Sequence, residues 1–154
     1  MPRTPFRPAL LAVAFAMAAA PIPIQAADNA AVKAMEEYLE FVDYGGGIIL
    51  PEQISAADWK NITVIDARDA GQYRKEHIPG ALNIEWRQAL ARRAELPQGK
   101  MVLLYCNTGT LSAQAGFTLR LAGMDNVRIL QDGFVGWKAK GGFDAHRRAV
   151  GAKE

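Results

Sequence analysis

The chain has 154 residues, half of them hydrophobic, which is enough for one domain with a substantial core. Its 18 basic and 16 acidic side chains give a formal net charge of +2, and two of the basic ones, Arg3 and Arg7, lie at the very start. The remainder is close to neutral, which argues against nucleic acid or an anionic membrane surface as the main partner.

The first residues have the layout of a secretory signal peptide. Arg3 and Arg7 precede an apolar stretch over residues 9–20, and small residues follow at a cleavage point after Ala26. This stretch is shorter than the roughly 20 apolar residues of a membrane span. We therefore predict a signal peptide over residues 1–26 and a periplasmic mature protein without a stable membrane span. An uncleaved N-terminal anchor is the alternative.

An amphipathic helix is predicted over residues 28–44, because its apolar side chains recur at helical spacing. Three consecutive glycines end it, so residues 27–47 form a helix and a glycine-rich connection. The helix is expected to pack on the domain. Docking of a partner protein through residues 30–44 is the alternative.

Short apolar runs alternate with helical patterns across the rest of the chain. The expected strands are 48–50, 62–65, 81–84, 101–105 and 127–130, and the expected helices begin near residues 51, 69, 86, 112 and 133. This alternation predicts a parallel sheet with helices on both faces. We place this domain at residues 48–142, followed by a frayed polar tail at residues 143–154.

The chain has a single cysteine, Cys106, which directly follows the apolar run 102–105. A loop of small and polar residues comes next, and helical periodicity begins at Ser112. Loop amides and the positive end of a helix dipole favour an anion, and so favour thiolate over thiol. We interpret Cys106 as a nucleophile. A buried inert thiol, or one paired with another chain, is the alternative, since one cysteine cannot form an internal disulfide.

Three segments in order resemble motifs of rhodanese domains. They are residues 64–68 followed by Tyr73, Glu76 and residues 77–84, then residues 104–112, and finally residues 130–134 with Trp137. The small exported single-domain thiosulfate sulfurtransferases are the most similar kind. The resemblance implies a doubly wound α/β fold with a five-stranded parallel sheet. It also implies a cysteine that cycles between thiolate and persulfide without any cofactor.

In this interpretation the loop after the cysteine binds the anionic donor and the persulfide through its amides and hydroxyls. The expected binding residues are Asn107, Thr108, Gly109, Thr110, Leu111 and Ser112. For Ser112 we expect helix capping as well. Many rhodanese loops carry an arginine or lysine after the cysteine, whereas residues 107–114 contain no cation. We therefore expect weak use of thiosulfate, or another sulfur donor.

Four further residues are candidates for the rim of the pocket: Asp66, Arg68, His77 and Trp86. Structural roles are favoured for three of them, with Asp66 and Arg68 fixing loops at a strand end and His77 stabilising a turn. For Trp86, lining the pocket and packing in the core are equally plausible. Two separated histidines and one cysteine do not make a metal site, so no metal is expected.

The predicted function is periplasmic transfer of sulfane sulfur from a donor such as thiosulfate to a thiol or cyanide acceptor, through a Cys106 persulfide. The alternative is a non-catalytic or sulfur-delivery module that docks a periplasmic protein. A cysteine phosphatase or arsenate reductase is set aside, since that chemistry requires an arginine six residues after the cysteine, where this chain has Ser112.

Overall fold

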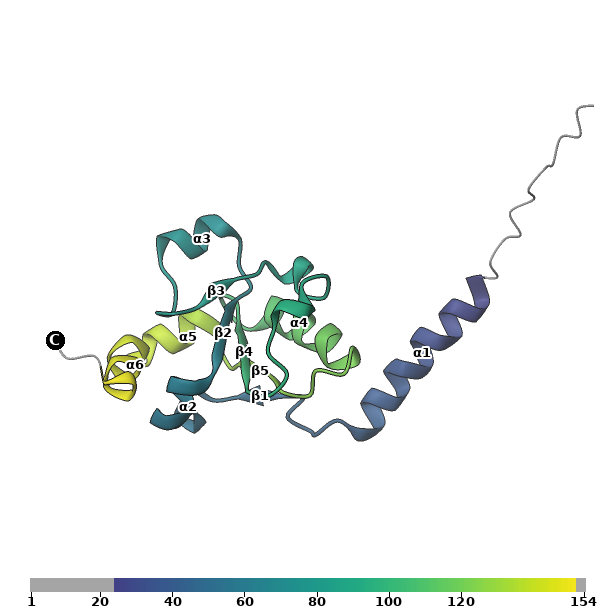
Figure 1. Cartoon of the computed structure of the whole chain (residues 1–154), viewed down its shortest axis with the longest axis horizontal. Helices are drawn as coiled ribbons and strands as arrows, with labels where there is room; N and C mark the ends of the chain where they lie inside the picture. The colour runs from purple at the N-terminus through teal and green to yellow at the C-terminus, as the bar shows by residue number, and fades with distance from the viewer. Residues whose placement is uncertain (1–23, 152–154) are drawn as a thin grey trace, which may run out of the picture.

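The computed structural model describes residues 24–151 and, within them, a five-stranded parallel sheet. Most of the predicted signal peptide lies outside the described residues. The strands run in the order β1-β5-β4-β2-β3 (Figure 1), with bounds β1 Ile48–Ile49, β2 Thr63–Asp66, β3 Leu82–Asn83, β4 Val102–Tyr105 and β5 Val127–Leu130. The predicted α/β fold with a five-stranded parallel sheet is confirmed.

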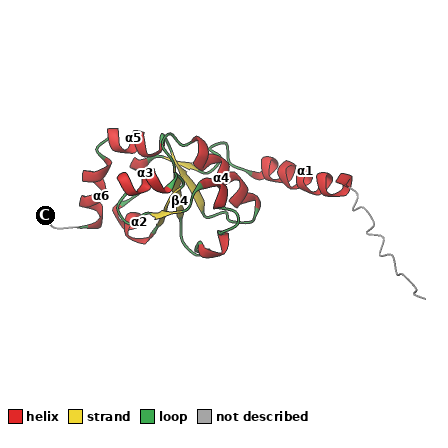
Figure 2. Ribbon diagram, turned by 90° about the horizontal axis from the view of Figure 1, so that it is seen from above, coloured by secondary structure: helices red, strands yellow, loops and turns green. Residues whose placement is uncertain are grey.

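Helices flank the sheet on both faces, and one helix extends away from it (Figure 2). The α-helices are α1 Ile24–Phe41, α2 Ala56–Asn61, α3 Ala70–Lys75, α4 Thr110–Leu121, α5 Gly133–Ala139 and α6 Gly142–Val150. Three short 3₁₀ helices complete the described range: η1 Pro51–Gln53, η2 Trp86–Gln88 and η3 Arg93–Glu95.

The core divides into two clusters because successive side chains of a strand point to opposite faces of the sheet. In β4, Leu103 and Tyr105 join one cluster with Phe134 and Trp137 of α5. Leu104 joins the other cluster with the inner face of α4. All four residues of β4 are fully buried, which makes it the central element of the domain.

The region predicted as one helix over residues 86–94 contains two 3₁₀ turns, η2 and η3, so that prediction was wrong. Glu85 caps η2 by accepting the amide hydrogen of Arg87, and Ala89 is buried in the core cluster that also contains α4. A tighter 3₁₀ turn lets a short connection place an apolar side chain in the core without continuing as a helix.

The polar tail expected from Phe143 onward is instead the helix α6, so that expectation was also wrong for the described part. Phe143 contacts Trp137 edge-to-face with 4.8 Å between ring centroids, and His146 contacts Trp59 of α2 in the same way at 5.0 Å. The two side chains are three residues apart and so lie on one face of the helix. This one face packs on the domain, although the composition of the segment is largely polar.

Helix α1 touches the domain at one place along its described side chains. Tyr38 contacts Phe117 of α4 edge-to-face at 5.1 Å, and the Arg120 guanidinium lies 5.7 Å from the Tyr38 ring centroid. Val32 and Leu39 stay more than half exposed. The predicted packing is therefore confined to Tyr38. Within residues 24–151, no helix is both long enough and apolar enough to cross a membrane.

His146 should make the stability of the domain depend on pH. Burial lowers the pKa of its imidazole, so the unfolded chain binds the proton more tightly than the folded one. The stabilisation is present above about pH 6.5, the unfolded value, and is lost as the pH falls toward the folded pKa. The free energy of unfolding, measured in urea, should therefore fall less steeply below pH 6.5 in His146→Leu than in the wild type. Parallel pH profiles would contradict this role.

Candidate active site

Cys106 lies at the carboxyl end of β4, and its side chain is 2% exposed. The three following residues form the loop that leads to α4, which begins at Thr110. Gly109 is the N-cap residue and has φ +97°, a conformation that disfavours side chains. The sequence analysis predicted that this helix begins at Ser112. It begins two residues earlier, so Ser112 lies inside its first turn.

The sulfur of Cys106 is surrounded by hydrogen-bond donors from the loop and the first turn of α4. Burial raises the pKa of the Cys106 thiol, but the amide and hydroxyl of Ser112 and the amides of Thr108 and Leu111 lower it by more. The net effect holds the pKa below its ordinary value. The Ser112 hydroxyl lies 3.6 Å from the sulfur and 3.0 Å from the carbonyl oxygen of Gly109, and its single proton is shared between these two acceptors.

The start of the loop is held by the first turn of α5. The Phe134 amide donates to the carbonyl oxygen of Cys106 at 2.7 Å, and the Val135 amide donates to that of Asn107 at 3.0 Å. Gly133 makes this approach possible. A Cβ on it would lie 2.5 Å from the Cys106 carbonyl oxygen, and its φ is +56°. Glycine is therefore required where α5 meets the loop.

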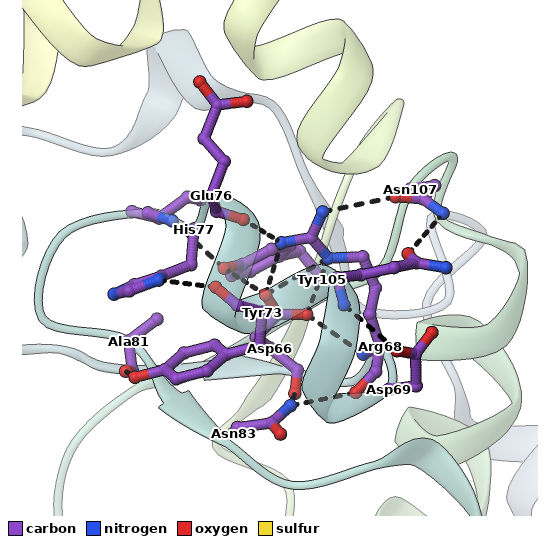
Figure 3. Close-up of polar contacts among 12 residues, drawn as sticks. Asp66, Arg68, Asp69, Tyr73, Glu76, His77, Ala81, Asn83, Tyr105 and Asn107 are labelled. Carbon is purple, nitrogen blue, oxygen red and sulfur yellow. Dashed lines mark hydrogen bonds and ion pairs between the residues drawn. The ribbon is translucent and has the colours of Figure 1, made fainter.

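A buried ion pair lies on the other side of the loop (Figure 3). The Arg68 guanidinium donates to Asp66 through Nε and Nη2, with a shortest distance of 2.6 Å, and Nη2 also donates to the carbonyl oxygen of Glu76 at 2.7 Å. Burial would lower the pKa of Arg68, but its bonds to Asp66 outweigh this and raise it. The remaining nitrogen, Nη1, donates to the Asn107 side chain at 3.3 Å.

Tyr105 completes this network from the strand that carries the cysteine. Its hydroxyl donates to Asp66 Oδ2 at 2.7 Å and accepts the amide hydrogen of Ile78 at 3.1 Å. Burial raises the pKa of the Tyr105 hydroxyl, and the nearby Asp66 carboxylate raises it further, so it stays protonated and donates. Sequence reasoning did not single out Tyr105. Its place directly before the cysteine, on the opposite face of the strand, was the available signal.

The four rim candidates lie in three different places. Asp66 and Arg68 reach the loop through Asn107, as described above. His77 Nδ1 lies 2.8 Å from the carbonyl oxygen of Tyr73, and its ring stacks on the Tyr73 ring, which fits the turn-stabilising role. Trp86 lines a separate, mainly apolar pocket of about 420 Å³ between η2 and α4.

The side chains of the loop residues differ in how far they are exposed to solvent. Ser112 is fully buried beside the sulfur, whereas the side chains of Thr108, Thr110 and Leu111 are exposed at the surface. Asn107 is exposed as well, but both ends of its amide group are bonded to neighbouring side chains. Gln72, which accepts one of those bonds, is a contact that the sequence did not indicate.

Comparison with known proteins identifies the family of this chain. The family model of the rhodanese-like domain matches residues 50–140. The chain belongs to the rhodanese-like domain family. This is a family of sulfurtransferases, whose reactions take a sulfur donor and a sulfur acceptor.

Two relatives and one solved structure illustrate the similarity. The chain is 34% identical to the protein YqhL of Bacillus subtilis over 91 residues, which cover 59% of the chain and 72% of YqhL. It is 32% identical over 80 residues to the thiosulfate sulfurtransferase GlpE of Coxiella burnetii, covering 52% of the chain and 75% of GlpE. A rhodanese-related protein from Thermoplasma volcanium superposes with a TM-score of 0.56 at 23% identity, over 61% of this chain and 92% of that one, which shows the shared fold.

Ser112→Ala should raise the apparent pKa of Cys106 in alkylation by iodoacetamide and, at pH values below that pKa, slow the reaction by about fivefold. Loss of one long hydrogen bond to the thiolate costs ~1 kcal/mol and raises the thiol pKa. The rate is followed against pH, and Cys106 is the only thiol that can react. Thr118→Ala is the matched control, because its hydroxyl is on the same helix but donates to Ala115. Equal rates in wild type and Ser112→Ala would show that the hydroxyl does not stabilise the thiolate.

Proposed function

We propose that the protein is a periplasmic sulfurtransferase that carries sulfane sulfur as a Cys106 persulfide, from a donor such as thiosulfate to a thiol or cyanide acceptor. The observation that carries the proposal is the buried sulfur of Cys106 inside a cradle of amides from Thr108, Leu111 and Ser112. Such a cradle stabilises an anion without a metal.

Two nucleophilic substitutions at sulfur make up the proposed cycle. The Cys106 thiolate attacks the outer sulfur of thiosulfate, the S–S bond of the donor breaks, and sulfite leaves with the bonding electrons. The product is a persulfide anion, about 2 Å longer than the thiolate. An acceptor thiolate or cyanide then attacks the terminal sulfur, and the thiolate of Cys106 leaves and is restored. Both resting forms of the cysteine are anions, which the same amides stabilise.

The charge of the loop bears on which sulfur donor the protein uses. Residues 107–114 carry no cation, and the nearby Arg68 is 6% exposed and already paired with Asp66. Thiosulfate therefore meets amide dipoles but no free positive charge from the loop. This supports weak binding of a small dianion.

The proposed export to the periplasm rests on the N-terminal sequence. Cell fractionation with N-terminal sequencing of the mature protein tests it.

Incubation of the purified protein with excess thiosulfate should add one sulfur atom to its intact mass. The Cys106→Ala variant should gain nothing, and cyanide should remove the added sulfur from the wild type and yield thiocyanate. Mass spectrometry under non-reducing conditions measures both steps. If no adduct forms with thiosulfate, with polysulfide or with mercaptopyruvate, the sulfurtransferase proposal fails.

A cation placed in the loop should improve the use of thiosulfate. Leu111→Lys is expected to lower KM about three- to five-fold with little change in kcat, since an exposed charge pair contributes up to ~1 kcal/mol. Leu82→Lys on β3 is the control, because Leu82 is also an exposed leucine but lies outside the loop. The effect should shrink at high salt. An equal fall in KM for both variants would indicate a general effect of charge instead.

A second function is favoured by one observation. Helix α1 exposes Val32, Met35 and Leu39 at helical spacing, and Tyr38 is its contact with α4. Exposed apolar stripes of this kind mark binding surfaces. A sulfur-delivery or non-catalytic module that docks a periplasmic protein is the corresponding alternative. It becomes the preferred function if Cys106 forms no persulfide while the folded protein still captures a partner through α1.

A further inference from the structure

The side chain of Asn107 is held from two directions although it lies at the surface. Its Oδ1 accepts from Arg68 Nη1 at 3.3 Å, and its Nδ2 donates to Gln72 Oε1 at 2.8 Å. An exposed amide normally exchanges its partners with water. Here both of its ends are bonded to protein, in the residue that directly follows the candidate nucleophile.

One of the two holding groups is itself fixed. Arg68 is buried, its Nε and Nη2 are bonded to Asp66 and to the Glu76 carbonyl, and its guanidinium carbon lies 4.4 Å from the Phe134 ring centroid and 5.5 Å from that of Tyr105. Planar bonding and ring contacts leave the guanidinium with a single orientation. Its remaining nitrogen therefore offers Asn107 a stationary donor.

The other holding group comes from α3. Asp69 caps this helix by accepting the amide hydrogens of Gly71 and Gln72. A glutamine three residues after the N-cap commonly bonds back to the N-cap amide. The Gln72 side-chain oxygen instead accepts from Asn107, 35 residues away in the chain. The capping is thus left to Asp69, and Gln72 is available to the active-site loop.

The peptide group after Asn107 connects this arrangement to the sulfur. Its carbonyl oxygen accepts from the Val135 amide, and its N–H is that of Thr108, one of the amides that lower the pKa of Cys106. In a planar trans peptide the C=O and N–H point in opposite directions. Holding Asn107 therefore aims the Thr108 N–H at the sulfur, with the main chain fixed by α5 and the side chain by Arg68 and Gln72.

We propose that Asn107 is a positioning residue, held by Arg68 and Gln72, which keeps the Thr108 amide directed at the Cys106 sulfur. The side-chain oxygen and one N–H of Asn107 are used in holding the residue itself. The importance of this for catalysis rests on the function proposed above. The positioning itself concerns only the state of the thiol.

Several charged groups around the loop are paired with one another. Arg68 neutralises Asp66, Lys138 of α5 lies 2.6 Å from Glu76, and Lys140 lies 3.5 Å from Asp132 at the start of α5. Thiolate stability at this site therefore depends on the direction of the amide dipoles more than on a free charge. That dependence makes the thiol pKa a sensitive measure of the loop geometry.

The test is a double-mutant cycle read out by the pH profile of Cys106 alkylation with iodoacetamide. Asn107→Ala should raise the apparent thiol pKa and slow alkylation at neutral pH about threefold. Gln72→Ala should have a smaller effect in the same direction. In the Asn107→Ala background, Gln72→Ala should have no further effect, because it acts through Asn107. Gln72→Glu keeps an acceptor and should behave as wild type at high salt, which screens its added charge.

Gln88→Ala, a change of an exposed glutamine on η2, is the matched control and should leave the profile unchanged. Urea denaturation of each variant identifies any change that comes from loss of the fold. The proposal is overturned if folded Asn107→Ala keeps the wild-type profile, or if Gln72→Ala acts equally in both backgrounds. Because alkylation requires no sulfur donor, either result is distinct from a failure to form a persulfide.

Discussion

The sulfur of Cys106 lies in a place that water hardly reaches, yet the groups around it favour its negative charge. Burial opposes that charge, and the donors that offset burial all belong to the short segment between β4 and the first turn of α4. Their combined effect depends on direction, because an amide dipole stabilises an anion only when its N–H points at it. The fold around the site can be understood as a means of fixing those directions.

Three elements supply that fixation from three sides. The loop and the first turn of α4 contribute the donors, with Gly109 allowing the turn into the helix. Helix α5 holds the main chain of the loop, which depends on the absence of a side chain at Gly133. The β2–α3 connection holds the loop from the opposite side through Arg68. The Asp66 carboxylate compensates the buried charge of Arg68. The Tyr105 hydroxyl donates a further hydrogen bond to that carboxylate.

Errors in the sequence interpretation share a cause. The 86–94 segment and the tail were judged on local pattern, and in both cases distant apolar contacts decided the outcome. Ala89 packs in the core cluster that contains residues of α4. Phe143 packs against the ring of Trp137, and His146 against that of Trp59. The start of α4 was placed late because the loop glycine, rather than a polar side chain, occupies the N-cap position.

The sequence by itself determined the strand–loop–helix frame around Cys106, the order of the α/β elements and the family resemblance, since these rest on apolar periodicity and on motifs that are local in the chain. Only the tertiary structure decided which groups surround the loop. Arg68 with Asn107, Gln72 with Asn107, and Val135 with the loop carbonyl join segments that are far apart in sequence. No periodicity encodes such contacts, because they depend on how the sheet brings separate strand ends to one edge.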